Sequence, residues 1–452
     1  MGGCGPVVDF VGGVGGRKRR NVKKLSPITV YYIRNGFDAF NSGLIFTALY
    51  VYYARTLALT PLQLAFVGTL HMLTHVLLEV PTGIVADVYS RKASVILGGL
   101  LTGICFVVTG TIPLYGAVLF ATLVEAMGDT FVSGALDAWL TDEVGADKFG
   151  SVILRSEQLG MPLHWVGVAV SVLLSTLFTS QTPILLGGAL WLVATVVLLV
   201  VMPETGFVRP AAAPITLSLR SGWLHMASTF GDSVQLVRGR RILFMLFAAQ
   251  LFIGAFMGGF YGLDQLHLFT GFTLPVLKLP WIGALNESAW IALIDGAKSP
   301  LYFLGIAMLR RNLDVGDPTA TAKALLGLFT LAGVAAMAFA LSPSFGVAVV
   351  TLCALGTIEN LTEPLLRTWL NQHITSDVRA TVLSMNTQVH RFGMLGGGLG
   401  IGALGNVAGL RIALSVAALF LLPLLTLLKR ETRNSILVTG DVVENEESFT
   451  AS

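Results

Sequence analysis

The chain has little charge and few cysteines for its length. Only 12% of its 452 residues are Asp, Glu, Lys or Arg, about half the share that is usual in soluble domains, whereas 54% are hydrophobic. The net charge of +3 comes from short basic clusters between apolar runs, which excludes the basic face that nucleic-acid binding needs. The three cysteines, Cys4, Cys105 and Cys353, form no motif, so we expect neither a disulfide nor a cysteine-bound metal.

Two patterns of reactive sites are also missing. The chain contains no Gly-x-x-x-x-Gly-Lys-Ser/Thr sequence, which would cradle the phosphates of a nucleotide. No nucleophile stands with a base in a recognisable constellation. We therefore expect a protein that is not an enzyme, uses no cofactor and holds no structural metal ion.

Long apolar runs, in contrast, are abundant. Windows of roughly 20 apolar residues, each able to cross a hydrocarbon core of ~30 Å as a helix, recur from end to end. They predict an all-α membrane protein with twelve transmembrane helices. The predicted spans are 28–54, 62–87, 93–112, 114–139, 150–178, 184–203, 241–263, 288–309, 321–341, 345–370, 378–404 and 409–428.

Positive charge is distributed unevenly over the loops and tails. With a cytoplasmic N-terminus, 22 of the 29 Lys and Arg residues fall on the cytoplasmic side and three fall outside. The positive-inside rule therefore places both termini in the cytoplasm, and the short loops favour a bacterial inner membrane. We expect residues 1–27 to be a disordered basic tail rather than a cleaved signal peptide, and 429–452 to be a second cytoplasmic tail.

The sequence also repeats itself weakly. When residue n is aligned with residue n+230, six of the 23 positions from 136 to 158 are identical, among them Trp139 with Trp369. Convergence of similar helix ends is one explanation. The explanation we favour is two pseudo-symmetric six-helix halves, 28–203 and 241–428, as in secondary transporters with a midplane site.

A segment without a transmembrane window, 204–240, joins the two halves. Its apolar residues recur at steps of three and four from Leu219 to Val237, which predicts an amphipathic helix. Such a helix either lies on the cytoplasmic membrane surface or packs on the protein itself.

One polar stretch, GIVADVYSRK at 83–92, interrupts the apolar sequence between the second and third predicted helices. It resembles the signature loop of the major facilitator superfamily, written Gly-x-x-x-Asp and then Arg/Lys-x-Gly-Arg-Arg/Lys. One basic residue and the turn glycine of that pattern are lost here. The matching residues are Gly83, Asp87, Arg91 and Lys92, and the departures are Val88 and Ser90.

The resemblance implies a conformational latch at this loop. Asp87 at a helix end can pair with Arg91, Gly83 permits close helix contact, and such a latch would stabilise one of two rocking states. Related transporters complete the cluster with an acid on helix four, a role that the resemblance gives to Asp137. The alternative is that Arg91 and Lys92 merely obey the positive-inside rule.

Two other stretches extend the resemblance to about residues 28–428. MPETG at 202–206 resembles the ending of the sixth helix in many members of the family, and RATVLSMN at 379–386 resembles the start of their eleventh helix. Similarity to the bacterial twelve-helix members implies alternating-access transport of a small solute by a monomer. It leaves the cargo and the direction of transport open.

The sequence departs from the drug-antiporter branch of that family. The usual Arg in the middle of helix four is replaced by acidic Glu125 and Asp129. The Gly-Pro motif of helix five is matched only loosely, by Gly160, Pro162 and Gly167. These departures weaken the case for proton-coupled drug export.

Several ionisable residues fall near the middle of the predicted helices. Charged groups are costly in lipid, so those at helix midpoints are expected to face a cavity and to take part in function. The candidates for proton coupling and substrate binding are Asp38, His71, Glu125, Asp129, His164, Lys298, Glu359 and Arg391.

Among these candidates, Glu125 and Asp129 stand one helical turn apart. Their mutual repulsion favours a bound proton near neutral pH, which suits a proton carrier. If Arg391 or Lys298 neutralises one of the two acids, the acidic pair would instead have a structural role. Two further sets, Arg34 with Asp38 and Asp295 with Lys298, have the spacing of ion pairs within one helix.

Helix two presents His71, His75 and Glu79 on one face at successive steps of four residues. A proton relay or cavity wall is the favoured interpretation, and a divalent metal site is the other. This face is also the only set of residues in the sequence that could form the active site of an intramembrane enzyme.

The sequence as a whole predicts a proton-coupled secondary transporter. The functional hypothesis that we favour is export of hydrophobic or amphiphilic compounds. The second hypothesis is proton-coupled uptake of nutrients or metabolites by symport. The alternative from a different class of protein is a lipid flippase or an intramembrane enzyme.

Overall fold

A computed structural model describes residues 25–207, 241–314, 316–372 and 379–430 of the chain. These residues are almost entirely helical. The two strands found among them, β1 (Lys278–Leu279) and β2 (Gly283–Ala284), form a short antiparallel pair in a loop. Most of the predicted linker and the outer parts of both predicted tails lie outside the described residues.

The helices follow the predicted spans closely. The first half contains α1 (Pro27–Val51) with a π-helical turn η1 (Tyr52–Thr56), α2 (Pro61–Val88), α3 (Arg91–Thr111), α4 (Tyr115–Val132), α5 (Ala135–Val144), α6 (Ala146–Leu177) and α7 (Gln181–Val201). The second half contains α9 (Arg241–Phe260), α10 (Leu263–Gly271), α11 (Ser288–Asn312), α12 (Pro318–Ala340), α13 (Phe345–Gln372), α14 (Arg379–Ala408) and α15 (Leu410–Leu419).

Ten spans among the described residues are long and apolar enough to cross a membrane. Within these spans, α4 joins α5, α9 joins α10, and the last span runs from α15 on to Arg430. The polar helix α1 and the glycine-rich helix α14 run alongside them and complete twelve. The predicted fold, an all-α protein with two six-helix halves, is confirmed.

Local sequence signals set where several of these helices begin. Thr60 caps α2, with Gln63 returning the hydrogen bond and Pro61 in the first turn. Gly134 and Gly262, at φ of 74° and 83°, interrupt two spans, between α4 and α5 and between α9 and α10. Residues with a side chain rarely adopt these backbone angles, so glycine is needed at both breaks.

Each half contains a very close helix crossing, and the two crossings match. In the first half α1 packs on α6, and a Cβ on Gly167 would overlap the backbone oxygen of Phe40. In the second half α9 packs on α14, and a Cβ on Gly397 would overlap the backbone oxygen of Ala255. Gly167 and Gly397 are separated by the 230 residues of the sequence repeat, so the repeat is also a structural one.

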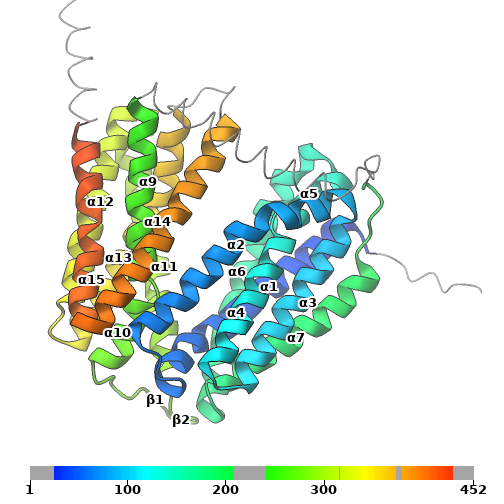
Figure 1. Cartoon of the computed structure of the whole chain (residues 1–452), viewed down its shortest axis with the longest axis horizontal. Helices are drawn as coiled ribbons and strands as arrows, with labels where there is room; N and C mark the ends of the chain where they lie inside the picture. Colours follow the sequence, from blue (N-terminus) through cyan, green and yellow to red (C-terminus); the bar gives the residue numbers. More distant parts are fainter. Residues whose placement is uncertain (1–24, 208–240, 315, 373–378, 431–452) are drawn as a thin grey trace, which may run out of the picture.

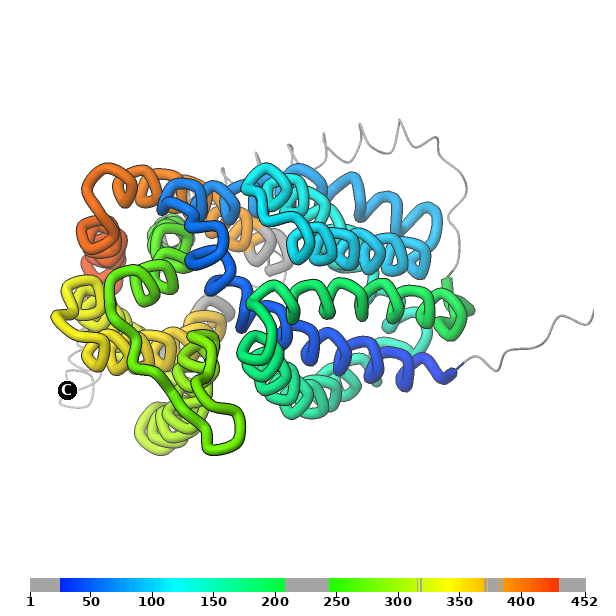
Figure 2. The backbone as a smooth tube through the Cα atoms, turned by 90° about the horizontal axis from the view of Figure 1, so that it is seen from below, coloured from blue at the N-terminus to red at the C-terminus, as the bar shows by residue number. Residues whose placement is uncertain are grey.

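The two halves lie side by side and meet mainly at one end (Figures 1 and 2). At the end that holds α10, β1 and β2, Arg55 forms a bidentate ion pair with Glu287, at 2.7 and 2.8 Å. The backbone N–H of Asn286 donates to Thr176 Oγ1 at 2.9 Å at the same end. Toward the end that holds α5 the helices of the two halves diverge (Figure 1). The halves are therefore closed against each other at one end only.

The close crossing of α1 and α6 can be tested with two alanine substitutions in the same helix. We expect Gly167→Ala to lower the free energy of unfolding by about 1–3 kcal/mol, because the added methyl group overpacks the crossing. Gly150→Ala, where a Cβ meets no atom within 4 Å, should instead raise it by ~0.4–1 kcal/mol. Thermal unfolding of the purified protein in detergent measures both, and equal stability of the two variants would contradict the packing.

Candidate functional site

Two adjoining cavities lie in the middle of the molecule. The first, of about 410 Å³, lies between the halves and is lined by α1, η1, α2, α3 and α4 on one side and α9 and α14 on the other. The second, of about 350 Å³, lies within the first half. Glu125, Asp129, Phe46 and Phe106 line both cavities. The two acidic residues therefore stand where the cavities adjoin.

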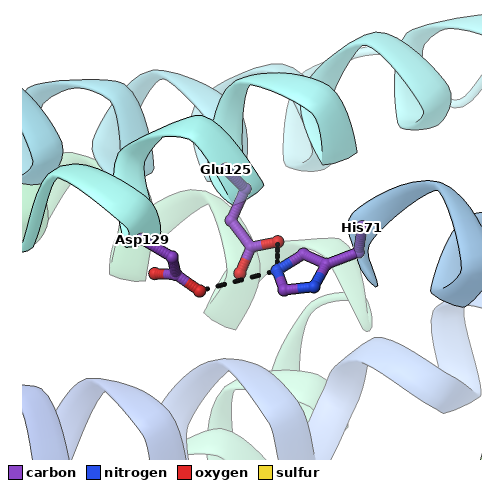
Figure 3. A group of neighbouring side chains, drawn as sticks. All are labelled: His71, Glu125 and Asp129. Carbon is purple, nitrogen blue, oxygen red and sulfur yellow. Dashed lines mark ion pairs between the residues drawn. The ribbon is translucent and has the colours of Figure 1, made fainter. Parts of the chain in front are cut away.

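A histidine from α2 faces these two acids on α4 (Figure 3). His71 Nε2 lies 3.1 Å from Glu125 Oε2 and 3.5 Å from Asp129 Oδ2. The acids are four residues apart, so the helix places both carboxylates on one face, toward the imidazole. A protonated His71 balances only one of the two negative charges. The cluster therefore attracts a further proton or another cation.

The same three ligand atoms lie within 4.8 Å of one another, close enough to hold a metal ion. An imidazole and two carboxylates suit a divalent ion. The metal site considered from the sequence, His71 with His75 and Glu79, is not assembled in this structure. The ring centroid of His75 is 6.3 Å from that of His71, and Glu79 turns toward the other half.

The wall of the first cavity is aromatic and rich in methionine. Ring faces attract organic cations, and thioethers adapt to irregular apolar surfaces. The wall therefore suits a cargo with apolar surface. Its aromatic and methionine residues are Phe46, Tyr50, Tyr53, Met72, Phe106, Met257, Tyr261 and Met394.

The second cavity contains the ion pair expected within the first helix. Arg34 Nη1 lies 3.2 Å from Asp38 Oδ2. Arg34 is only 6% exposed, and its guanidinium stands 4.7 Å from the ring centroid of Trp191. Asp38 lines the cavity beside Glu125 and Asp129. Since Arg34 neutralises Asp38, the uncompensated negative charge of this region lies on the α4 acids.

Arg391 makes a contact that sequence reasoning did not find. It forms an ion pair with Glu79 of α2, and Gln388 Nε2 lies 3.4 Å from the same carboxylate. The pair joins the two halves through α2 and α14. Glu79 and Arg391 both stand out in the sequence as polar residues inside helices, but no sequence spacing connects residues this far apart.

The remaining predicted site residues lie away from the His71 cluster. Lys298 Nζ donates to Asp295 Oδ1 at 2.8 Å, within α11, as the spacing suggested. Glu359 Oε2 accepts a hydrogen bond from the Tyr261 hydroxyl at 2.6 Å. His164 Nδ1 lies 3.3 Å from the backbone oxygen of Ala39, at the α1–α6 crossing. None of Lys298, Glu359 and His164 is among the described residues that line the two cavities.

The residues of the expected latch lie at the open end. Arg91 lies 3.8 Å from Asp87, pairs with Asp142 and donates to the backbone oxygen of Ala138 at 2.6 Å. The acid of α5 that reaches Arg91 is thus Asp142, whereas Asp137 stands more than one turn earlier in that helix. At Gly83 a Cβ would meet no atom within 4 Å, so the close helix contact expected there is not made in this conformation.

The latch loop also contacts the MPETG segment. Ser90 Oγ lies 2.8 and 2.9 Å from the two carboxylate oxygens of Glu204, and Lys92 Nζ donates to the backbone oxygen of Met202 at 2.6 Å. Trp139 Nε1 donates to the backbone oxygen of Pro203 at 2.7 Å. Ser90 replaces the turn glycine of the signature, and its hydroxyl caps α3 by accepting from Ala93 N. The two motifs recognised in the sequence therefore form one structural unit.

Twelve membrane-spanning helices in two similar halves, with charged groups enclosed between them, define a multi-pass membrane transporter. The sequence matches the Major Facilitator Superfamily over residues 33–400, and the chain belongs to that family. A Bacillus subtilis (strain 168) protein, described as the uncharacterized MFS-type transporter YxaM, is 22% identical over 396 residues, covering 87% of this chain and 93% of its own. Members of the family bind small-molecule substrates and reside in membranes.

Solved structures show the same fold at low sequence identity. A point mutant of the nucleoside transporter NupG superposes with a TM-score of 0.66 at 14% identity, covering 90% of this chain and 99% of its own. A bacterial homolog of the human lysosomal transporter Spinster, inward-facing and unoccupied, gives 0.63 at 13% identity, covering 90% and 96%. A POT family transporter in complex with 5-aminolevulinic acid gives 0.61 at 12%, covering 90% and 96%.

The ion pair between the halves can be tested by a double-mutant cycle. We expect Glu79→Gln and Arg391→Gln each to lower the free energy of unfolding by roughly 1–3 kcal/mol, below the 3–5 kcal/mol of a fully buried pair because both groups are partly exposed. Each single variant leaves an unpaired charge between the halves. The double variant should recover at least half of the loss, as measured by thermal unfolding in detergent.

The exposed Glu363–Arg367 pair of α13 is the matched control. Glu363→Gln should change the free energy of unfolding by less than about 1 kcal/mol. Strictly additive losses at residues 79 and 391 would contradict a direct interaction between these two side chains.

Proposed function

We propose that this transporter exports amphiphilic organic cations in exchange for protons. The observation that carries the proposal is the uncompensated negative charge of Glu125 and Asp129 on the wall of an aromatic cavity. Two carboxylates share one imidazole there, and Arg34, which lines the second cavity, is held by Asp38. A membrane interior does not tolerate such an excess unless a proton or a cationic cargo occupies it.

The aromatic wall supports a cargo that is apolar as well as positively charged. Phe46 and Phe106 stand beside the acids in both cavities, so a cation held by the carboxylates would lie against ring faces. The volume of about 410 Å³ lies within the range of pockets for drug-sized ligands. A sugar or a free amino acid would leave most of this apolar wall without a partner.

Competition for the same carboxylates supplies the coupling. A proton on the Glu125–Asp129 pair removes the charge that holds a cationic cargo, so proton and cargo bind alternately. His71 takes part by sharing its proton with either carboxylate. Exchange of a proton for a cargo molecule at a single site is sufficient for antiport, provided that the site opens to one side of the membrane at a time.

The contacts between the halves support transport by alternating access. If the positive-inside rule holds, the open end with the latch faces the cytoplasm and the Arg55–Glu287 end faces outside. The conformation described here is then inward-open, in an inner membrane with both termini cytoplasmic. Rocking to the outward state breaks the outer ion pair and closes the latch loop against the second half. We propose that a monomer carries out this cycle.

Transport can be measured with protein reconstituted in liposomes that contain a pH-sensitive dye. We expect lipophilic amines and quaternary ammonium compounds to drive proton flux, whereas sugars, amino acids and nucleosides do not. Glu125→Gln and Asp129→Asn should each reduce this flux by roughly tenfold or more, since a hydrogen bond to a charged group contributes ~1.5–3 kcal/mol. Asp147→Asn, which removes an exposed acid at the start of α6, is the control and should leave the flux unchanged.

The direction of the coupled fluxes separates export from uptake. Cation and proton moving in opposite directions supports export by antiport. Movement in the same direction would replace the proposal with uptake by symport, and cation-driven flux that survives the loss of both acids would remove the α4 pair from the mechanism.

A further inference from the structure

The second half contains a group of buried acids that the His71 cluster does not involve. Asp264 lies in the first turn of α10, directly after the break at Gly262, and is only 5% exposed. Its Oδ1 is buried and has no hydrogen-bond partner among the described residues. An ionised carboxylate with a bare oxygen in such a place is costly.

Glu359 of α13 shows the same feature. Its Oε2 accepts the hydrogen bond from the Tyr261 hydroxyl at 2.6 Å, whereas its Oε1 is buried and unpartnered among the described residues. Asp264 and Lys298 are the charged groups whose fields act on Glu359. The two acids thus belong to one electrostatic group, drawn from α10 and α13.

The positive charge available to this group is too small. Lys298 is the one basic side chain among the described groups that act on Asp264 and Glu359, and it already donates to Asp295 at 2.8 Å. Three acids therefore face one amine. Three other titratable groups interact electrostatically with members of this group: Tyr50 with Asp264, Cys353 with Lys298, and Glu363 with Tyr261.

We propose that Asp264 and Glu359 form a second protonation site of this transporter, separate from the His71 cluster, which holds at least one proton in the conformation described here. The ligand is a proton on a carboxyl oxygen of this pair of acids. Each proton bound there removes one unit of the excess negative charge, so the unpartnered oxygen belongs to a neutral acid, which costs less to bury than an ion.

Tyr261 connects this site to the cavity between the halves. It lines the first cavity, as Tyr50 does, and it is hydrogen-bonded to Glu359. When Glu359 is ionised, the Tyr261 hydroxyl donates to it. When Glu359 is protonated, its O–H can donate to the tyrosine oxygen, and the tyrosine O–H is free to turn toward the cavity. Proton binding in the second half therefore changes a hydrogen-bond donor on the cavity wall, and only this coupling to cargo rests on the proposed function.

Infrared difference spectroscopy of the protein in lipid detects protonated carboxyl groups directly, without transport. Between neutral and alkaline pH we expect carboxylic-acid C=O bands that Asp264→Asn or Glu359→Gln removes and that Glu125→Gln leaves in place. Tyr261→Phe keeps the ring and the charge, so it should fold normally and shift the Glu359 band by removing its hydrogen bond. Asp147→Asn is the exposed control and should change none of these bands.

Three results would overturn the proposal. The first is a wild-type spectrum whose bands none of the three substitutions at 261, 264 and 359 alters. The second is a set of bands that the Glu125→Gln variant also lacks, which would assign them to the first half. The third is their loss on adding Na⁺ or Li⁺ at constant pH, which would make this a metal-cation site. Bands that persist in a protein without cation-driven proton flux would refute the proposed function and leave this site intact.

Discussion

The cost of placing charge in a membrane is the constraint on which this structure depends. Ionised side chains are expensive in hydrocarbon unless a partner or water compensates them. The Arg34–Asp38 pair meets this requirement within one helix, and the Glu79–Arg391 pair meets it across the two halves. Acids that no base compensates fully remain on α4 and around α10 and α13. The constraint that pairs most charges therefore also singles out the acids at which we propose that protons or cations bind.

The two halves are tightly packed internally, and they touch each other through polar contacts as well as through the packing of α2 on α14. Within each half the glycine crossings bring helix backbones together so closely that no side chain fits between them. Between the halves, α2 also packs closely on α14, where a Cβ on Gly402 would overlap the Cβ of Ala65. Beside this packing stand ion pairs and hydrogen bonds, such as Arg55 with Glu287 and Asn286 with Thr176. Contacts of this kind can break and reform at little net cost in water. In the proposed cycle these polar contacts change while each half keeps its internal packing.

The helices could be predicted because lipid leaves the backbone few alternatives. Without water to satisfy its N–H and C=O groups, a spanning segment must be a helix or part of a closed barrel, and apolar runs mark the helices directly. Pairs within a helix, such as Lys298 with Asp295, follow from the helical repeat alone. In both cases the decisive physics is local in sequence.

Contacts between helices could not be predicted in the same way. That Glu79 meets Arg391, or that His71 points at the α4 acids rather than at His75, depends on how helices tilt and cross. The latch gives a clear example. The resemblance pointed to Asp137, but the positive-φ break at Gly134 sets the direction of α5, and Asp142 reaches Arg91 instead. Sequence spacing specifies a face of a helix, whereas a break changes the direction in which that face points.

The two halves share the residues that pack their helices but differ in the residues that surround their buried acids. Trp139 and Trp369, identical in the repeat, are both almost fully buried at 1% and 2% exposure, so the shared residues pack the helices. The acids are compensated differently, by the imidazole of His71 in one half and by a tyrosine hydroxyl and a lysine in the other. Rocking needs two halves of the same shape. The proposed proton coupling needs them to bind different partners, because two identical sites would respond alike to the same proton. In the proposed cycle, the symmetric packing therefore serves the rocking of the halves, and the asymmetric charges serve the coupling.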